Sequence, residues 1–348
     1  MLAREIDHNV DNFVSIIMPS LNEEHFIEAA VNSVIPNVAG LDYEILIIDG
    51  GSVDGTLRIV ERLSSENPRI RLLHNPKRLQ AAALNIGAAQ ADTRSNVLVR
   101  ADCHALYSSD FAVRCITALR ESGAASVVVP MRTVGQNCIQ SAIAAAQNSP
   151  VGNGASPHRL KTQSGYVPHG HHAAFDRTVF LQQGGYNETM ECNEDAEYDY
   201  RLTRAGHKIW MEADAPVTYY PRKSFSRLAV QYFRHGKGRA MTQFIHGSSL
   251  LPRQMAPVAL LFSTLAAVVL SPISIIFAFP TALYLIIIGI FALKRSIESK
   301  QACALLIAPA AFIMHHGWAL GFVYNFASLR IARAKHRALS AEKANPLG

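Results

Sequence analysis

The sequence predicts an α/β domain with a mostly parallel sheet, followed by helices that cross a membrane. In the first part of the chain, short apolar runs alternate with segments of helical periodicity, which is typical of a parallel sheet covered by helices on both faces. Further on, residues 258–293 contain no charged side chain, and residues 301–329 contain none apart from two histidines. A spanning helix needs about 20 apolar residues, so both stretches suffice; a pair of buried core helices is the alternative.

Five short apolar runs are expected to form the strands, and they lie at residues 13–19, 44–49, 70–74, 96–100 and 126–130. Helices are expected after Asn22, from a glycine turn to about residue 64, and over residues 79–90. Asn22 is expected to cap the first of these helices, with Glu23 in its first turn.

Polar residues follow several of the predicted strands. Asn22, Asp49 and Asp102 each come shortly after an apolar run. Ligands of parallel α/β sheets bind beyond the carboxyl ends of the strands. The sequence therefore predicts a binding site at this edge of the sheet.

The composition is that of a partly membrane-embedded protein. Of the 348 residues, 49% are hydrophobic and only 17% are charged, with a net charge of +6; the charged share is low for a soluble protein. The five cysteines are scattered and odd in number, which argues against a disulfide framework and a structural zinc site. No apolar run resembling a secretory signal precedes residue 13, so everything before residue 258 is expected to stay in the cytoplasm.

Three motifs carry the predicted chemistry, and they are Pro-Ser-Leu-Asn-Glu-Glu at 19–24, Asp-Gly-Gly-Ser-Val-Asp-Gly-Thr at 49–56 and Arg-Ala-Asp-Cys-His at 100–104. Together they resemble the family 2 glycosyltransferases of the GT-A fold, whose motifs are close to P-x-x-N-E, D-D-G-S-x-D-G-T and D-x-D. With the C-terminal apolar stretches, the outline is similar to the ExoA-type glucosyltransferases of succinoglycan biosynthesis. The resemblance implies an enzyme that uses a nucleotide sugar, with uracil the usual base.

The resemblance also implies which residues bind the nucleotide. They belong to all three motifs and are Pro19, Asn22, Glu23, Asp49, Gly51 and Asp102. The carboxylate of Asp49 is expected to accept hydrogen bonds from the nucleobase; the alternative is a plain strand-to-helix turn organised by this aspartate. Asp54 is better explained as a turn or cap residue.

The chain departs from the family pattern at two positions. Gly50 stands where a second aspartate is common, and Arg100 stands at the first aspartate of D-x-D. Asp102 is expected to bind a divalent cation, Mn2+ or Mg2+, with His104 as a second ligand. Arg100 is expected to contact the diphosphate as a fixed charge. The alternative is that Arg100 and His104 are structural and the metal site is weak.

An acidic segment at residues 191–199 resembles the E-D motif of the family. An inverting transfer needs a base that takes the proton of the attacking hydroxyl, and the resemblance assigns this role to Asp195, with Glu194 as the local alternative. The same residues also suit the N-terminus of a helix. Glu197 and Asp199 are expected to solvate that helix or to pair with arginines.

Two further segments are expected near the substrates. The histidine segment 169–172, beginning at His169, is expected to border the sugar and the diphosphate, with metal binding as a less favoured reading. Residues 231–235 resemble the Q-x-x-R-W motif of processive members, with His235 in place of tryptophan. Gln231 and Arg234 would then contact the acceptor and the diphosphate, and residues 236–239 add phosphate-compatible charge. A basic helix at the membrane surface is the alternative.

The predicted organisation is a polar lead (1–12), a GT-A domain (13–240), a basic juxtamembrane linker (241–257), a membrane region (258–329) and a basic tail (330–348). Residues 131–257 are read as the acceptor-binding half, ending in the linker. Pro272 and Pro280 can break the first apolar stretch into two spans. The basic tail favours an even number of crossings and Lys294 with Arg295 favours three, so two or three spans remain open.

The sequence thus predicts an inverting transferase at the inner membrane, with its catalytic domain facing the cytoplasm. The expected donor is UDP-glucose or a similar nucleotide sugar, and the expected acceptor is a lipid-linked saccharide of exopolysaccharide biosynthesis. The alternatives are a processive polysaccharide synthase and a non-catalytic nucleotide-sugar-binding membrane subunit. Nucleic-acid binding is not expected, because the basic residues cluster beside apolar stretches.

Overall fold

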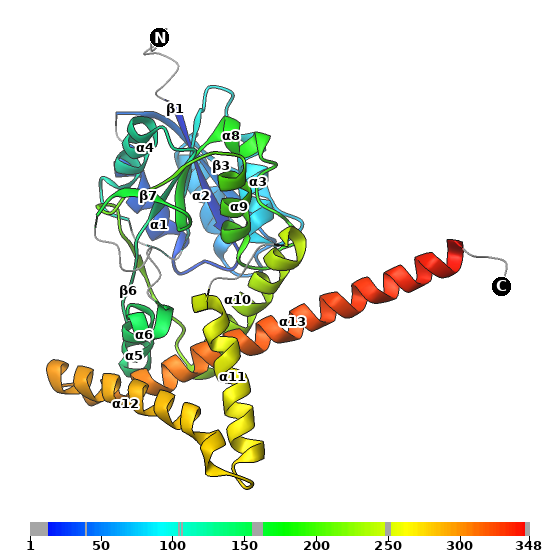
Figure 1. The fold of residues 1–348 in the computed structure, drawn as a ribbon. Coiled ribbons are helices and arrows are strands. Elements are labelled where there is room, and N and C mark those ends of the chain that lie inside the picture. The colour runs from blue at the N-terminus through cyan, green and yellow to red at the C-terminus, as the bar shows by residue number, and fades with distance from the viewer. Residues whose placement is uncertain are drawn as a thin grey trace. The chain divides into compact units, whose positions relative to one another are not determined.

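The computed structural model describes residues 13–38, 40–103, 105, 107–154, 163–247 and 252–344 (Figure 1). They form two compact units. The first unit contains the chain up to Arg132 and the segment from Ser156 to Tyr219, and the second contains Thr133 to Ala155 and the chain from Tyr220 onwards. The predicted polar lead, His104 and the last four residues of the basic tail lie outside the described residues.

The first unit is built on an eight-stranded sheet in the order β3-β2-β1-β4-β8-β5-β9-β7. Strands β1 to β4 are parallel to one another, β8 runs antiparallel between β4 and β5, and β9 is parallel to β5. The strands are β1 (Phe13–Ser20), β2 (Asp42–Asp49), β3 (Ile70–His74), β4 (Val97–Arg100), β5 (Ser126–Val129), β7 (Gly165–Val167), β8 (His171–Asp176) and β9 (Ile209–Met211). A separate pair joins β6 (Met131–Thr133) to β10 (Val217–Tyr219). All five predicted strands are confirmed.

Helices cover both faces of this sheet, as predicted. They are α1 (Ile27–Val34), α2 (Thr56–Glu66), α3 (Gln80–Gln90), α4 (Phe111–Ser122), α8 (Arg177–Gln182) and α9 (Glu194–Arg204). Alternation along β1 explains the two layers: Val14, Ile16 and Met18 pack in one cluster with α1 and α4, whereas Ile17 packs in the other with α3 and α9. Because β2, β1 and β4 are neighbouring parallel strands, their carboxyl ends lie side by side.

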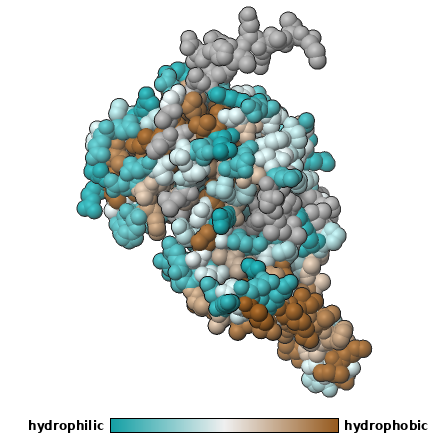
Figure 2. Space-filling view, turned by 90° about the vertical axis from the view of Figure 1, so that its left-hand side faces the viewer, coloured by the Kyte–Doolittle hydropathy of each residue, from teal (hydrophilic) through white to brown (hydrophobic). Residues whose placement is uncertain are grey.

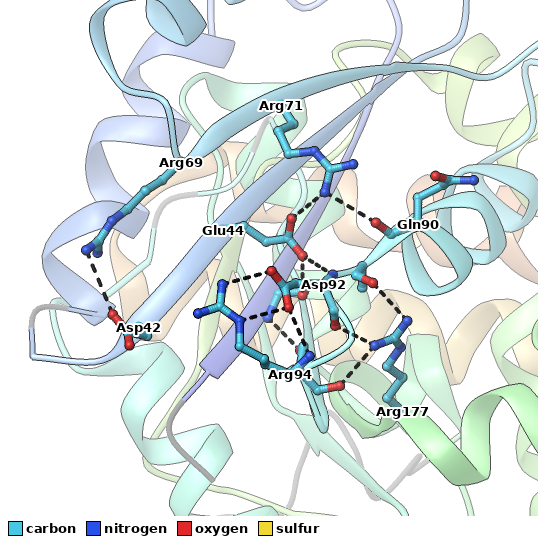
Figure 3. A network of polar contacts seen from close by, with 11 residues as sticks. Asp42, Glu44, Arg69, Arg71, Gln90, Asp92, Arg94 and Arg177 are labelled. Carbon is cyan, nitrogen blue, oxygen red and sulfur yellow. Dashed lines mark hydrogen bonds and ion pairs between the residues drawn. The ribbon is translucent and has the colours of Figure 1, made fainter. Parts of the chain in front are cut away.

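A polar network fixes the opposite, amino end of these strands (Figure 3). The buried carboxylate of Glu44 accepts hydrogen bonds from the Ser15 hydroxyl (2.7 Å), the Arg71 guanidinium (2.7 Å) and the backbone N–H of Asp92 (2.6 Å). Beside it, Arg177 donates to backbone carbonyls at the end of α3 and in the following turn, namely those of Ala88, Ala91, Asp92 and Ser95. Orphan carbonyls at a helix end need such partners, so Arg177 stabilises the connection from α3 to β4.

The second unit is helical. It contains α5 (Cys138–Gln147), α6 (Pro150–Asn153), α10 (Phe225–His246), α11 (Pro252–Leu270), α12 (Phe279–Ser299) and α13 (Ile307–Ala344), with short 3-10 turns at Ile275–Ala278 and Ala302–Leu306. Among the described residues, three segments are long and apolar enough to cross a membrane, and they are Pro252–Leu270, Ile275–Ser299 and Ala302–Lys335. Figure 2 shows hydrophobic side chains gathered on part of this unit. The first predicted apolar stretch is broken after Leu270, next to Pro272, as expected.

Helices α10 and α13 approach each other at glycines. A β carbon on Gly236 would lie 1.9 Å from the carbonyl oxygen of Trp318, and one on Gly321 would lie 1.9 Å from that of Phe233. Gly236 to Arg239, expected to add phosphate-compatible charge, lies inside α10, and Gly236 allows the two backbones to touch.

A disulfide joins Cys138 of α5 to Cys303 in the turn before α13, with a Cα–Cα distance of 5.3 Å. The scattered cysteines argued against a disulfide framework, and the structure nevertheless forms this bridge. The two cysteines are 165 residues apart in the sequence, and no motif links them. Only the packing of α5 against the connection between α12 and α13 brings them together.

Candidate active site

The first two motifs interlock at the carboxyl ends of β1 and β2. Asn22 has a left-handed backbone (φ 57°). Its Oδ1 accepts a hydrogen bond from the backbone N–H of Val53 (2.9 Å), and its own N–H donates to the Ser52 hydroxyl (2.8 Å). One residue on, the N–H of Glu23 donates to the Thr56 hydroxyl (2.8 Å).

The prediction that Asn22 caps the first helix was therefore wrong. Helix α1 begins only at Ile27 and has no side-chain cap, so Glu23 is not in its first turn either. The amide of Asn22 is used instead to hold the second motif, thirty residues away in the chain. The two motifs form one closed turn.

Asp49 ends β2 and is 2% exposed. Its Oδ2 accepts from the backbone N–H groups of Gly51 (2.7 Å) and Ser52 (2.9 Å), and its Oδ1 accepts from the Ser52 hydroxyl (2.5 Å). Gly51 has a φ of +81°, and a β carbon there would lie 3.2 Å from the guanidinium of Arg78. Asp49 thus organises the turn from β2 to α2, which agrees with the alternative of a plain strand-to-helix turn. Its contact with a nucleobase stays a prediction.

Sequence reasoning missed Arg78 altogether. It follows β3, has a left-handed backbone (φ 56°) and brings a positive charge to the glycine turn. A non-glycine residue with positive φ is uncommon, but the sequence around Arg78 gives no sign of that conformation. The basic pair that it forms with Lys77 was the only available signal.

Arg100 and Asp102 form a bidentate pair beyond the end of β4. The Arg100 side chain is buried, and its Nε and one terminal nitrogen donate to the two Asp102 oxygens at 3.0 and 3.3 Å. Gln80 also donates to Asp102 (3.1 Å) and His171 Nε2 lies 3.8 Å from it, while the Tyr107 hydroxyl accepts from its backbone N–H (2.5 Å).

This arrangement does not fit a divalent cation by itself. Both Asp102 oxygens are held by a guanidinium, and the described part of the chain contains no group of three or more histidine, cysteine or acidic side chains that could hold a metal ion. The predicted second ligand, His104, lies outside the described residues. Arg100 itself supplies a permanent positive charge where the family usually has an acid.

The histidine segment lies next to this pair and is held from helix α9. Asp199 is 1% exposed and accepts from His169 Nδ1 (2.6 Å), His172 Nε2 (2.7 Å) and the backbone N–H of Gly170 (3.3 Å). Burial, followed by the charge of Arg100, lowers the pKa of His171 to about 4. The expectation that Asp199 solvates its helix was wrong, because the side chain points into the unit.

By contrast, the predicted pairing of Glu197 is confirmed. Its two carboxylate oxygens accept from Arg201 at 2.8 and 2.9 Å, one helical turn away.

Glu194 and Asp195 are the first two residues of α9, as the acidic helix start predicted. Burial and the neighbouring Asp195 raise the pKa of Glu194. Burial also raises the pKa of Asp195, but His169, His172 and Arg100 outweigh it, so that this pKa lies below its usual range. Two neighbouring carboxyl groups whose pKa values are shifted in opposite directions are typical of acid–base sites.

The structure thus brings together most of the predicted site residues in the first unit. Arg100, Asp102, His169, Glu194 and Asp195 interact electrostatically with one another. The turn formed by the first two motifs lies at the adjacent strand ends, and the Cys103 thiol, next to Asp102, donates to the Pro19 carbonyl (3.2 Å). Gln231 and Arg234 lie on α10 in the second unit, so their predicted contacts with substrate stay predictions.

Comparison with known proteins bears on the family and the fold of this chain. Residues 15–183 match the family model described as glycosyl transferase family 2. The chain is 39% identical over 312 residues to the succinoglycan biosynthesis protein ExoA of Rhizobium meliloti, covering 88% of this chain and 93% of that protein. It is 24% identical over 322 residues (89% and 96%) to a dolichyl N-acetyl-alpha-D-glucosaminyl phosphate 3-beta-D-2,3-diacetamido-2,3-dideoxy-beta-D-glucuronosyltransferase of Methanococcus voltae.

A solved structure shares the fold. The mannosyltransferase PcManGT from Pyrobaculum calidifontis, in complex with GDP-Man and Mn2+, superimposes with a TM-score of 0.54 at 19% identity, over 90% of this chain and 86% of that one. The predicted GT-A fold is confirmed. The length of the match to ExoA, together with the family model, shows that this chain belongs to glycosyl transferase family 2.

Proposed function

We propose that this enzyme transfers a sugar, with inversion, from UDP-glucose or a similar nucleotide sugar to a lipid-linked saccharide. The observation that carries the proposal is the meeting of a buried arginine, three histidines and four carboxyl groups near the carboxyl end of β4. The likeness to ExoA along nearly the whole chain supports a role in succinoglycan-type exopolysaccharide biosynthesis.

The donor binds across the strand ends in this proposal. Pro19, Asn22, Glu23, Asp49 and Gly51 form the closed turn that receives the nucleoside. The turn is already held by its own hydrogen bonds, so little order has to be gained on binding. Arg100, Asp102 and His169 face the diphosphate, and Arg100 offers it a charge that does not titrate.

A divalent cation, Mn2+ or Mg2+, belongs to the proposal because the archaeal mannosyltransferase of this fold was solved with Mn2+. Asp102 and His104 are its proposed ligands. We assign it no step, since Arg100 holds both oxygens of Asp102 here. Titration of the purified enzyme with Mn2+ after chelation, beside Asp102→Ala, measures the requirement directly.

Asp195 is the proposed base. Its lowered pKa keeps it ionised at neutral pH, ready to take the proton of the acceptor hydroxyl as that oxygen attacks the anomeric carbon. Glu194 is held closer to neutrality by its raised pKa, so it presents less negative charge to the donor. The departing nucleoside diphosphate is stabilised by Arg100. Gln231 and Arg234 are the proposed acceptor and diphosphate contacts, on the strength of their motif.

The test is transfer of radiolabelled sugar from a panel of UDP-sugars into a membrane lipid extract. Asp195→Asn is expected to keep UDP binding and lose transfer by at least about 100-fold, whereas Glu194→Gln loses less. Near-normal transfer by Asp195→Asn would refute the assignment of Asp195 as the base. Wild-type protein that binds UDP-sugars but transfers none would instead indicate a non-catalytic subunit, and long products would indicate a processive synthase.

The proposed location is the inner membrane, with the first unit on the cytoplasmic side. Three apolar segments support membrane insertion, and the basic residues of α10 favour the side of the anionic leaflet. Labelling of single introduced cysteines in intact and permeabilised cells tests the orientation. Labelling of the first unit in intact cells would refute it.

A further inference from the structure

Asp199 is a buried carboxylate whose two oxygens are both engaged by the histidine segment. Oδ1 lies 2.7 Å from His172 Nε2, and Oδ2 lies 2.6 Å from His169 Nδ1 and 3.3 Å from the backbone N–H of Gly170. Burial raises the pKa of Asp199, but His172 and His169 outweigh it and hold the pKa below its usual range. Asp199 therefore acts as an acceptor for both rings.

The position of the protons follows from the next contact. The Tyr186 hydroxyl lies 2.5 Å from the other ring nitrogen of His172, Nδ1. Burial raises the pKa of Tyr186 well above its usual value, so the phenol keeps its proton and can donate it to Nδ1. His172 Nε2–H donates to Asp199 Oδ1, and Oδ2 of the same carboxylate faces His169.

His169 is the partly exposed member of this group, with 31% of its side chain accessible. Because its Nδ1–H is directed to Asp199, Nε2 lies on the far side of the ring. Asp195 is within electrostatic reach of this ring, and also of Arg100, His171 and His172. A phosphate oxygen accepts hydrogen bonds, so a contact with Nε2 requires a second proton on the ring, whose positive charge the Asp199 carboxylate stabilises.

We propose that Asp199 is a positioning residue that fixes the orientation and the proton of His169, so that His169 Nε2–H donates to the diphosphate of the nucleotide sugar. The inference rests on the proposed function, because it takes the nucleoside diphosphate as the ligand. Asp199 does not touch substrate and acts through His169. The segment from 169 to 172 is thereby a diphosphate contact held from helix α9.

Asp199→Asn tests this with little change in size. An amide has one acceptor and one donor group, so it cannot accept from both rings, and its NH2 group meets one of the two N–H groups. The matched control is Glu197→Gln, which removes another buried carboxylate from the same helix but one that pairs with Arg201. Thermal melting of all variants checks that they fold.

The readout is binding of UDP compared with binding of uridine, by calorimetry or ligand-observed NMR, because only UDP has a diphosphate. Asp199→Asn is expected to weaken UDP binding about tenfold and to leave uridine binding unchanged, and Glu197→Gln is expected to change neither. In a transfer assay, the KM for the donor should rise more than kcat falls. His169→Ala should give the same loss, and the double variant Asp199→Asn with His169→Ala should lose no more than either alone.

Three outcomes would overturn the inference. Asp199→Asn could bind UDP as tightly as wild type, it could lose UDP and uridine equally, or the losses from Asp199→Asn and His169→Ala could add. Each would show that Asp199 has only a structural role. Wild-type protein that binds no UDP would refute the proposed donor class itself, and the inference with it.

Discussion

Replacement of Arg100 by alanine is expected to weaken both the fold and donor binding. The change removes the two charge-assisted hydrogen bonds to Asp102, at 3.0 and 3.3 Å, in a pair whose side chains are only 5% and 14% exposed. Loss of one partner from a buried ion pair costs about 3–5 kcal/mol. Asp102 keeps the hydrogen bond from Gln80, so the lower end, about 3 kcal/mol, applies.

The same residue is expected to set donor affinity. A hydrogen bond from a charged group contributes about 1.5–3 kcal/mol, which corresponds to a loss of roughly 10- to 150-fold in UDP binding. Chemical unfolding of the detergent-solubilised protein measures the first effect, and calorimetry with UDP measures the second.

The chain offers a matched control in Arg94. It forms a pair of the same bidentate geometry with Asp92, at 3.0 and 2.9 Å, but these side chains are 62% and 29% exposed. Exposed pairs contribute little, so Arg94→Ala is expected to leave unfolding and UDP binding close to wild type. Equal effects of Arg100→Ala and Arg94→Ala, or unchanged UDP binding in Arg100→Ala, would refute this reasoning.

Three further predictions concern other parts of the chain. Cys138→Ser opens a 165-residue loop, which is expected to cost up to about 5 kcal/mol of folding stability in the chain-entropy model. Reduction of the wild-type protein should lower its melting temperature similarly. A variant that melts at the wild-type temperature would show that the disulfide does not form. Gly236→Ala places a methyl group against the α13 backbone and is expected to destabilise by at least about 1–3 kcal/mol, whereas Gly289→Ala, with open space around it, is expected to be neutral; similar melts for both would argue against the close contact. Because burial and Asp195 raise the pKa of Glu194 above 4.5, this group makes stability fall as the pH rises from about 4.5 towards neutrality, whereas His171, whose pKa is lowered to about 4, makes stability rise over part of the same range. In pH-dependent unfolding, Glu194→Gln is therefore expected to gain stability relative to wild type as the pH rises through this range, and a constant difference between the two would contradict the prediction.

The strands were predictable to within one or two residues at most of their ends, because each is an apolar run bounded by proline, glycine or an acidic residue. Helix α1 was placed too early, because Asn22 and Glu23 have the composition of a helix start but bond to a turn that is distant in sequence. Local patterns do not encode that choice. The same limitation explains the disulfide between Cys138 and Cys303.

The candidate site was predicted as a set of residues but not as a network. The motifs named Arg100, Asp102, His169, Glu194 and Asp195, which the structure brings together. They could not reveal that Arg100 binds Asp102, because β4 ends at Arg100 and the strand periodicity that would place the two side chains no longer applies at Asp102. Nor could they assign Asp199, whose partners come from a segment some thirty residues earlier.

The place of β8 in the sheet has a consequence for synthesis. During synthesis, β2 and β4 can each pair with β1, and β3 can pair with β2, as soon as they leave the ribosome. By contrast, β5 pairs only with β8 and β9, both of which come later in the chain. At about 5–20 residues per second, β5 waits at least a few seconds for its first neighbour. Strand β8 then joins β4 to β5, and its second residue is His172, which Asp199 holds. The turn formed by the first two motifs can thus be complete early, whereas the histidine segment is held in place only after β8 and α9 have been made.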